Sequence, residues 1–293
     1  MMSDGTAAQI QARSLGYSYV GRDWKTVNAG QRKSLESVSF HLPAGHVVAI
    51  LGLSGSGKTT LLKVLGLLLN PRRIRGSLTL GGHNYASLSQ AEQVSFRSRR
   101  FGFVFQSANM LSAFSCLDNI LLPTRLQRFG RKRQSKVVRM TIDCLCDDRR
   151  QRKEIFEVLR KRPSQISGGQ RQRMAVVRAV AHDPEVVFAD EPCASLDSVN
   201  SQQVMRLLLR WQQGGLSRDP DRTSNSKTLF LVTHDTTQAC DVAQYFLVLH
   251  DGKLVGGQAF NRDQMPVRHG KLDVEKIELA MNTGKVEGFS LDG

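Results

Sequence analysis

The sequence lacks the features of a membrane-spanning or exported chain. Its 293 residues contain no uncharged apolar run of about 20 residues, the length that a helix needs to cross a bilayer. The N-terminus shows no charged, apolar and cleavage regions in the order of a signal peptide. Internal repeats and low-complexity blocks are absent as well. With 40% hydrophobic residues, the composition predicts a soluble globular protein.

Cysteine is scarce and irregularly spaced. The five cysteines have neither the density of a disulfide framework nor the spacing of a metal site; they are Cys116, Cys144, Cys146, Cys193 and Cys240. The pair Cys144 and Cys146 has no further cysteine or histidine nearby. We expect these two to be partly buried thiols in a reducing compartment.

The most informative feature that is present is a phosphate-binding loop, Gly52-Leu53-Ser54-Gly55-Ser56-Gly57-Lys58-Thr59. An apolar run at residues 47–51 precedes it and predicts a buried strand, and residues from Thr60 to 65 predict a helix. The glycines allow successive N–H groups to point at phosphate oxygens, and the helix N-terminus adds its positive dipole end. Lys58 is then expected at the β- and γ-phosphates of a nucleoside triphosphate, with the Thr59 hydroxyl on Mg²⁺.

Three further segments carry candidate functional residues. Ser167-Gly168-Gly169-Gln170 predicts a helix start with a serine cap, which is a second anion-binding geometry. The apolar residues 186–189 predict a buried strand that ends in Asp190 and Glu191, at the edge where α/β sheets bind ligands. A last predicted strand, residues 228–233, is followed by His234.

At these segments the sequence resembles the ATP-binding subunits of ABC transporters. The resemblance extends from about residue 10 to about residue 257, and Ser167-Gly168-Gly169-Gln170 is similar to the signature that other phosphate-loop ATPases lack. The order of the motifs along the chain also matches the family. The resemblance implies a subunit that binds and hydrolyses ATP with Mg²⁺, dimerises on ATP and drives a separate integral-membrane permease.

The resemblance also implies roles for single residues. Asp190 corresponds to the Mg²⁺ carboxylate, and Glu191 to the general base that polarises the attacking water. His234 corresponds to the histidine that contacts the γ-phosphate, and Gln106, after the predicted strand 101–105, to the glutamine that meets Mg²⁺ and water. Asp197 lies where the family places a dimer-contacting loop.

Two implied features concern the nucleotide base and the second chain. Tyr17 or Tyr19 would stack on the adenine, and we favour Tyr19. The signature of a second copy, here Ser167 and Gly169, would complete each ATP site, so we expect a dimer of two ATP-binding subunits, with a homodimer favoured. Isolated monomers should therefore bind ATP but hydrolyse it poorly.

Within the family the sequence is most similar to the lipoprotein-release and macrolide-export type of ATP-binding subunit. The residues that carry this similarity are 101–106, 109–111, 119–120, Pro123 and 189–192. Departures from the family pattern include Cys193, where threonine is usual, and the apolar exchanges Ile166, Val177 and Val180. Cys193 puts the geometry of the loop before Asp197 in question.

The expected fold class is α/β, with a phosphate-loop (RecA-like) ATPase core, a mainly parallel sheet, an antiparallel β region near the N-terminus and an inserted α-helical lobe. We place the ATP-binding domain at residues 10–258. Within it the core covers about 10–110 and 173–258, and the helical lobe about 111–172. Residues 20–34 and 214–227 are predicted surface insertions. The tail, 259–293, has one predicted helix at 274–281 and no motif.

The net charge of +15 is concentrated in the predicted helical lobe. Residues 125–162 contain 14 Lys and Arg against 5 Asp and Glu, a local excess of +9 (14 − 5). A solvated helical face is the default explanation of such a run. Contact with an anionic membrane surface ranks next, at roughly 1 kcal/mol for each nearby cation. Nucleic acid ranks third and is not expected, since no recognition motif accompanies the charge.

Three functional interpretations compete. The first is a transport ATPase subunit, peripheral to the cytoplasmic face of the inner membrane. The second is a non-transport ABC ATPase that acts on nucleic acid or ribosomes, against which counts the lack of a long coiled-coil insertion or a second cassette. The third is an interaction module that binds ATP without turnover, against which counts the presence of Lys58, Glu191 and His234.

Overall fold

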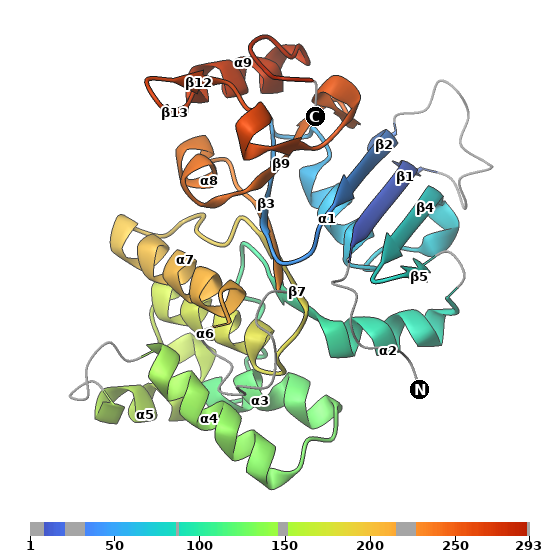
Figure 1. The fold of residues 1–293 in the computed structure, drawn as a ribbon. Helices are drawn as coiled ribbons and strands as arrows, with labels where there is room; N and C mark the ends of the chain where they lie inside the picture. The colour runs from blue at the N-terminus through green and yellow to red at the C-terminus, as the bar shows by residue number, and fades with distance from the viewer. Residues whose placement is uncertain (1–8, 21–32, 86–87, 146–151, 215–226, 292–293) are drawn as a thin grey trace. The chain divides into compact units, whose positions relative to one another are not determined.

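The computed structural model describes residues 9–20, 33–85, 88–145, 152–214 and 227–291. Most of the two predicted surface insertions lies outside these ranges. The chain forms two compact units: Met1–Gln93 with Phe230–Gly293, and Val94–Leu229. Each unit is described separately below (Figure 1). The predicted boundaries of core, lobe and tail stay predictions.

The first unit contains an antiparallel sheet in the order β2-β1-β4-β5. Its strands are β1 (Ile10–Tyr17), β2 (Leu35–Leu42), β4 (Ile74–Leu80) and β5 (His83–Asn84). Ile10 pairs with Leu42 on one side and Leu80 on the other, and all three side chains are buried. The sequence predicted antiparallel β structure in this region of the chain.

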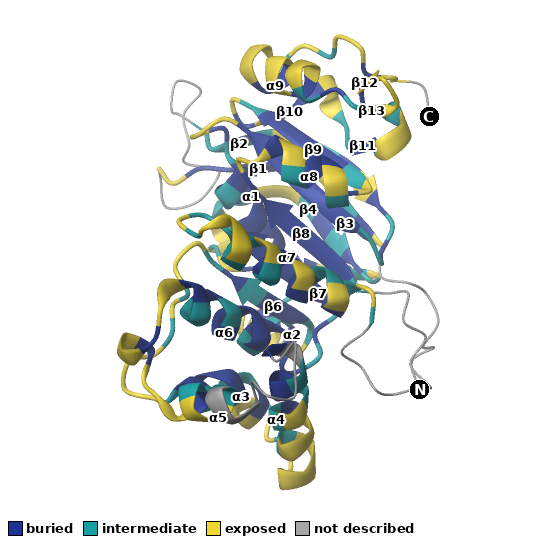
Figure 2. Ribbon diagram, turned by 90° about the vertical axis from the view of Figure 1, so that its left-hand side faces the viewer, coloured by how far each residue is buried: buried dark blue, intermediate teal, exposed yellow. Residues whose placement is uncertain are grey.

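A second set of strands in the first unit is ordered β10-β9-β3-β8, with β11 paired to β9. Strand β3 runs parallel to β9, and Gly52 pairs with Leu249. The bounds are β3 (Val47–Gly52), β8 (Thr228–Val232), β9 (Tyr245–His250), β10 (Lys253–Leu254) and β11 (Phe260–Asn261). Every residue of β3 and β8 is buried, as the predicted apolar runs require (Figure 2).

Helices and short strands complete the first unit. They are α1 (Lys58–Leu65), α8 (Thr236–Val242), β12 (Val267–Arg268), β13 (Lys271–Leu272) and α9 (Val274–Thr283). Helix α9 contains the helix that the tail sequence predicts. It packs on β9, where Ile277 is fully buried and the Met281 carbonyl oxygen lies 2.9 Å from His250 Nδ1.

The second unit has two parallel strands, β6 (Phe101–Val104) and β7 (Val186–Asp190). Its helices are α3 (Cys116–Leu126), α4 (Arg131–Leu145), α5 (Arg152–Arg160), α6 (Gly168–Val180) and α7 (Ser198–Gln212). The helix start predicted at Ser167 is present, and α3, α4 and α5 lie within the predicted helical lobe. Helix α2 (Gln90–Arg100) is not among the elements that the sequence predicted.

An aromatic cluster fills the core of the second unit between β6 and β7. Phe101 and Phe188 meet edge to face at 5.1 Å between ring centroids, and Phe103 stacks on Phe188 at 5.5 Å. Phe96 reaches the same cluster from α2. Phe96 is the one apolar side chain of α2 that is buried, and its packing on Phe101 connects a mostly polar helix to β6.

The described cysteines are free thiols, with Cys116 and Cys240 buried and Cys193 half-buried. Burial raises the pKa of Cys116, and it raises the pKa of Cys240 to about 11. The prediction for Cys144 and Cys146 falls on side chains outside the described set. At neutral pH the thiols of Cys116 and Cys240 are protonated, which makes them poor nucleophiles.

His182, after α6, gives the second unit an acid-sensitive position. Its ring is buried, and its Nε2 donates to the Phe101 carbonyl oxygen at 3.0 Å. Burial lowers the pKa of His182 to about 4, against about 6.5 in an unfolded chain. The neutral ring is favoured in the folded state, so stability is lost as the pH falls from about 6.5 towards 4.

We predict that His182→Gln reduces this acid sensitivity. At pH 5 the wild type should have lost about 2 kcal/mol of unfolding free energy relative to pH 7.5 through His182 alone, whereas glutamine does not titrate there. Urea unfolding at the two pH values measures the difference, with exposed His41 changed to glutamine as the control. If wild type and His182→Gln lost the same unfolding free energy between pH 7.5 and pH 5, the acid sensitivity would not be due to His182.

Candidate nucleotide-binding site

The phosphate-binding loop connects β3 to α1 in the first unit. Three glycines have positive φ: Gly52 at 147°, Gly55 at 80° and Gly57 at 105°. A Cβ on Gly52 would lie 2.4 Å from both the Leu249 carbonyl oxygen and Ser56 Oγ. Side chains at Gly52 are thus excluded by the close approach of β9 as well as by backbone conformation.

Polar groups inside the loop are arranged as a phosphate site requires. Lys58 Nζ donates to the carbonyl oxygens of Gly52 and Leu53, both at 2.8 Å. Ser56 Oγ is buried and has no hydrogen-bond partner. Because a buried hydroxyl without a partner is costly, an acceptor such as a phosphate oxygen fits this position. Thr59, the predicted Mg²⁺ ligand, lies in the first turn of α1.

The first unit also contains the two tyrosines considered for the adenine. Tyr17 is buried, and burial is the main cause of its raised pKa. Tyr19 is 50% exposed, and its hydroxyl lies 3.4 Å from Oγ1 of Thr60, next to the phosphate loop. Its ring packs edge to face on Tyr17 at 5.0 Å. The exposure and position of Tyr19 agree with the choice of Tyr19, which stays a prediction.

His234 is an exposed residue in the turn between β8 and α8. Its two neighbours fix that turn: the Asp235 N–H donates to Thr233 Oγ1 at 3.0 Å, and the Asp235 carboxylate accepts from the Gln238 N–H at 2.9 Å. Since β8 is the neighbour of β3 in the strand order, His234 and the phosphate loop extend from adjacent strands of the first unit.

In the second unit, Gln106 lies on an exposed segment that follows β6. Helix α6 anchors this segment on both sides of the glutamine. Gln172 Nε2 donates to the Phe105 carbonyl oxygen at 2.9 Å, and Arg178 donates to the carbonyl oxygens of Ala108 and Asn109, both at 2.7 Å. These contacts could not be predicted from local sequence, because they connect residues about 70 positions apart.

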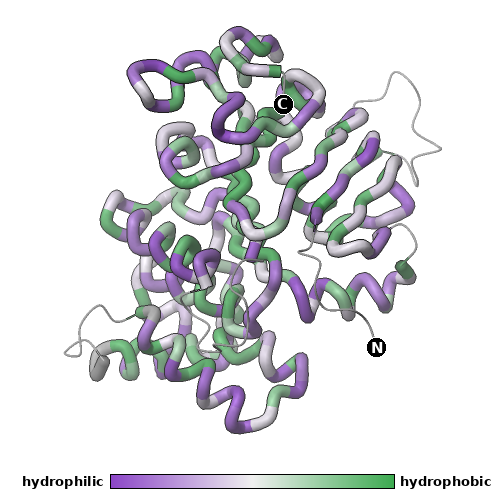
Figure 3. Tube along the Cα trace, viewed as in Figure 1, coloured by the Kyte–Doolittle hydropathy of each residue, from purple (hydrophilic) through white to green (hydrophobic). Residues whose placement is uncertain are grey.

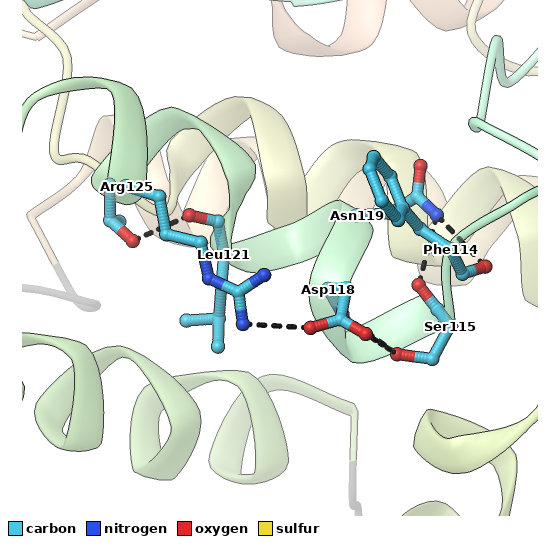
Figure 4. A network of polar contacts seen from close by, with 7 residues as sticks. Phe114, Ser115, Asp118, Asn119, Leu121 and Arg125 are labelled. Atoms are coloured by element: carbon cyan, nitrogen blue, oxygen red, sulfur yellow. Dashed lines mark hydrogen bonds and ion pairs between the residues drawn. The ribbon is translucent and has the colours of Figure 1, made fainter.

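A buried asparagine continues the anchoring of the same segment (Figure 4). Asn119 in α3 is fully buried; its amide nitrogen donates to the Leu111 and Ser115 carbonyl oxygens, at 3.0 and 2.9 Å, and its oxygen accepts from the Leu111 N–H at 2.7 Å. Ser115 caps α3, and its hydroxyl also donates to Asp118. This bond and Arg125 lower the pKa of Asp118.

The signature segment begins α6 with a capping box. Ser167 Oγ accepts from the Gln170 N–H at 3.2 Å, and the Gln170 side chain accepts from the Ser167 N–H at 3.0 Å. Arg171 Nη1 donates to the Ile166 carbonyl oxygen at 2.8 Å and supports the turn before the cap. The predicted serine-capped helix start is confirmed. The Ser167 hydroxyl is exposed and can still donate a hydrogen bond to a ligand.

Asp190 and Glu191 lie at the C-terminal end of β7. Asp190 is the buried last residue of the strand, and Glu191 is half-buried with φ at 48°. Beyond them, the Cys193 thiol donates to the Ser201 carbonyl oxygen at 3.6 Å. The thiol therefore ties this turn to α7.

Asp197 is the N-cap of α7. Its carboxylate accepts from the Asn200 N–H at 2.8 Å and from Asn200 Nδ2 at 2.6 Å. These two bonds lower the pKa of Asp197, and the bond from the Asn200 N–H has the larger effect. The Asn200 amide also lies against Gly169, where an added Cβ would come within 2.2 Å of Asn200 Oδ1. Asn200, which the sequence did not single out, thus connects Asp197 to the signature.

The two signature glycines should respond differently to alanine. Gly168→Ala meets nothing closer than Arg171 at 3.9 Å, whereas Gly169→Ala displaces the Asn200 amide and with it the Asp197 bond. We expect Gly169→Ala to lower the unfolding free energy by about 1–3 kcal/mol and to reduce activity, with Gly168→Ala as the matched control. Shortening the clashing side chain by Asn200→Ala should make Gly169→Ala nearly neutral. Equal effects of the two alanines in urea unfolding would refute this packing argument.

Comparisons with known proteins agree with the motifs. The sequence profile described as "ABC transporter" matches residues 35–194. The chain is 34% identical over 246 residues to the lipoprotein-releasing system ATP-binding protein LolD of Porphyromonas gingivalis, which covers 84% of the chain and 98% of the relative. It is 35% identical over 237 residues to the macrolide export ATP-binding/permease protein MacB of Chlorobium phaeobacteroides. That match covers 80% of the chain and 31% of the relative, so the chain spans about a third of the length of this relative.

A solved structure matches as well. It is a dimeric post-hydrolysis state of the ATP-binding cassette MJ0796 bound to ADP and Pi, with a TM-score of 0.67 and 26% identity over 86% of this chain and 98% of that one. The predicted α/β ATPase-cassette fold is confirmed by this likeness. Among the described residues, no helix is both long and apolar enough to span a bilayer.

Proposed function

The chain belongs to the ABC transporter family, as an ATP-binding subunit that hydrolyses ATP, and we propose that its hydrolysis drives a separate integral-membrane permease. The observation that carries this proposal is the order of the motifs on one chain: phosphate loop, Gln106, signature, Asp190-Glu191 and His234. The likeness to LolD over 98% of its length supports a stand-alone subunit. A location at the cytoplasmic face of the inner membrane follows from this role.

We assign the binding of ATP to residues of the first unit. In phosphoryl transfer, negative charge spreads over the γ-phosphate oxygens, and catalysis is mostly positioning and electrostatic stabilisation. Lys58 exchanges the carbonyl oxygens of Gly52 and Leu53 for phosphate oxygens. Ser56 Oγ gains an acceptor in the same step. Tyr19 offers its exposed ring to the adenine.

The hydrolytic step is assigned to Glu191 and His234. Glu191 accepts a proton from water as the water oxygen attacks the γ-phosphorus; the bond to the bridging oxygen breaks, and ADP and phosphate are the products. His234 contacts the γ-phosphate. When bound, Mg²⁺ adds positive charge at the phosphate oxygens, and Thr59, Gln106 and Asp190 would hold it. Oxygen ligands from only a few residues suit Mg²⁺, which retains several waters.

The second half of each ATP site comes from another copy of the chain. Ser167 and Gly169 of one copy act on the nucleotide held by the phosphate loop of the other, and Asp197 lies at the contact between the copies. Two-fold symmetry makes this contact self-complementary and gives two equivalent sites. A homodimer is the simplest assembly with this property.

Glu191→Gln tests the base. The variant keeps the shape of the side chain and removes the carboxylate, so it should bind ATP normally while hydrolysis slows by roughly 10²–10⁴-fold. It should also accumulate an ATP-bound dimer in size-exclusion chromatography. Near-normal turnover would place the base elsewhere.

The trapped Glu191→Gln protein also tests the permease. Affinity purification from detergent-solubilised membranes in ATP should recover one polytopic membrane protein together with the variant. A tagged Lys58→Ala protein serves as the nucleotide-free control. Recovery of ribosomes or nucleic acid in place of a membrane protein would support the non-transport alternative.

The final experiment tests whether signature and phosphate loop act across two chains. Ser167→Arg should block the opposing γ-phosphate position, and Lys58→Ala should weaken nucleotide binding, so each variant alone should be inactive. In a mixed dimer one composite site carries both changes and the other carries neither. Activity should therefore partly return on mixing.

Recovery on mixing could not occur if each chain completed its own site. The control is a mixture of Lys58→Ala with Glu191→Gln, since these two residues serve the same nucleotide. In that mixed dimer each site carries one change, and activity should stay low. Heterodimer formation is verified with two different tags. If the heterodimer of Ser167→Arg and Lys58→Ala forms but does not hydrolyse ATP, one of two assumptions is wrong. Either the signature does not act across chains, or one intact site cannot hydrolyse ATP while the other is inactive.

A further inference from the structure

The basic character of the second unit is concentrated at one corner, where α3 ends and α4 begins. Residues 125–142 include seven Lys and Arg and no Asp or Glu: Arg125, Arg128, Arg131, Lys132, Arg133, Lys136 and Arg139. Arg125 forms an ion pair with Asp118 at 2.7 Å. Within the described ranges, none of the other six forms an ion pair. No role in ATP hydrolysis accounts for this charge.

Three of these cations form a stripe along α4. Lys132, Lys136 and Arg139 are separated by four and three residues and are exposed, so they lie on one side of the helix. The opposite side is buried through Val137, Thr141, Ile142 and Leu145. Packing thus orients the charged side of α4 outward, and the trace at the start of α4 is mostly hydrophilic in Figure 3.

An exposed apolar side chain lies close in the sequence to two of the cations. Leu126, the last residue of α3, is 72% exposed, which is the highest value among the large apolar side chains of the described residues. Arg125 and Arg128 flank it in the sequence. The aromatic ring nearby is covered: the guanidinium of Arg133 lies 3.6 Å from the centroid of the Phe129 ring.

We propose that this α3–α4 corner, consisting of Leu126, Arg128, Lys132, Lys136 and Arg139, binds an anionic phospholipid surface. Phosphodiester headgroups complement the cations, and the acyl region below them accommodates Leu126. Single-stranded nucleic acid would also complement the charge, but it is bound by stacking on exposed aromatic rings. The Phe129 ring is half-buried and already has the Arg133 guanidinium stacked on it. The lipid proposal rests on the proposed function only for the location of the protein at a membrane. Lipid binding at this corner requires neither ATP nor a second copy of the chain.

The experiment is vesicle co-sedimentation of the purified protein without nucleotide. The vesicles consist of phosphatidylcholine alone or of phosphatidylcholine mixed with phosphatidylglycerol. The protein should bind the mixed vesicles and should be released by salt, because the attraction between exposed charges is screened. Each cation near an anionic surface changes the partition coefficient by about fivefold. The triple reversal Lys132→Glu, Lys136→Glu and Arg139→Glu should therefore lower binding more than tenfold.

A matched control separates this corner from the net charge. The triple reversal Lys271→Glu, Lys276→Glu and Lys285→Glu removes the same charge from exposed positions in the first unit and should retain most of the binding. Leu126→Gln should weaken binding with no change in charge. Equal losses in the two triple variants, or wild-type binding that is independent of phosphatidylglycerol, would overturn the proposal.

Two further measurements distinguish lipid binding from RNA binding and from a failure of the proposed function. A fluorescent single-stranded RNA is titrated in the same buffer; RNA binding that depends on the corner, without vesicle binding, would overturn the lipid assignment. ATPase activity is measured in every preparation, and the α4 triple variant should retain it, which also shows that it is folded. Absent ATPase activity in the wild type with intact vesicle binding would contradict the proposed function and leave the lipid assignment in place.

Discussion

The hydrogen bonds from α6 to the loops around it are the constraint on which the second unit depends. The helix begins in the Ser167 capping box, and along its length Gln172 and Arg178 hold the backbone on either side of Gln106. These bonds are directional, so α6 cannot shift or rotate without moving the Gln106 segment. The signature and the Gln106 segment therefore behave as one mechanical element, although about 60 residues separate them in the sequence.

In the first unit, the lysine of the phosphate loop is already hydrogen-bonded without a ligand. Lys58 occupies two carbonyl oxygens of its own loop, whereas the buried Ser56 Oγ has no hydrogen-bond partner. Nucleotide binding is therefore an exchange of hydrogen bonds rather than a simple gain. Its net free energy is the difference between Lys58 bound to phosphate and Lys58 bound to carbonyl oxygens. The charge-assisted bond to phosphate is the stronger of the two, so the loop is preorganised and still favours the ligand.

Much of the fold followed from local sequence signals, and the long-range contacts did not. Strands β3, β7 and β8 are uninterrupted apolar runs, and Ser167 precedes a glycine pair at the start of a helix; each signal lies within a few residues. Helix α2 escaped prediction because most of its residues are polar or arginine and show no apolar face, although Ser89 and Glu92 form a capping box at its start. The anchors Asn119, Gln172, Arg178 and Asn200 escaped it as well. Gln172 and Arg178 bind backbone carbonyls about 70 residues away, which no local signal reveals. Asn119 and Asn200 bind groups within eight residues, but their residue type alone does not indicate which.

Glu191 is one of several residues other than glycine that have a positive φ, and it lies directly after β7. Its φ of 48° lies in the left-handed region, which costs a residue other than glycine about 1–3 kcal/mol. The residue also precedes Pro192, where extended backbone is normally favoured. The surroundings impose this conformation: β7 is buried throughout, the Ala194 N–H donates to the Glu191 carbonyl oxygen at 3.2 Å, and the Cys193 thiol holds the turn to α7. A fold tolerates such a cost where the direction of one side chain matters more than local stability. The strained turn fixes the direction in which the Glu191 carboxylate leaves the end of β7, and a general base requires a fixed position.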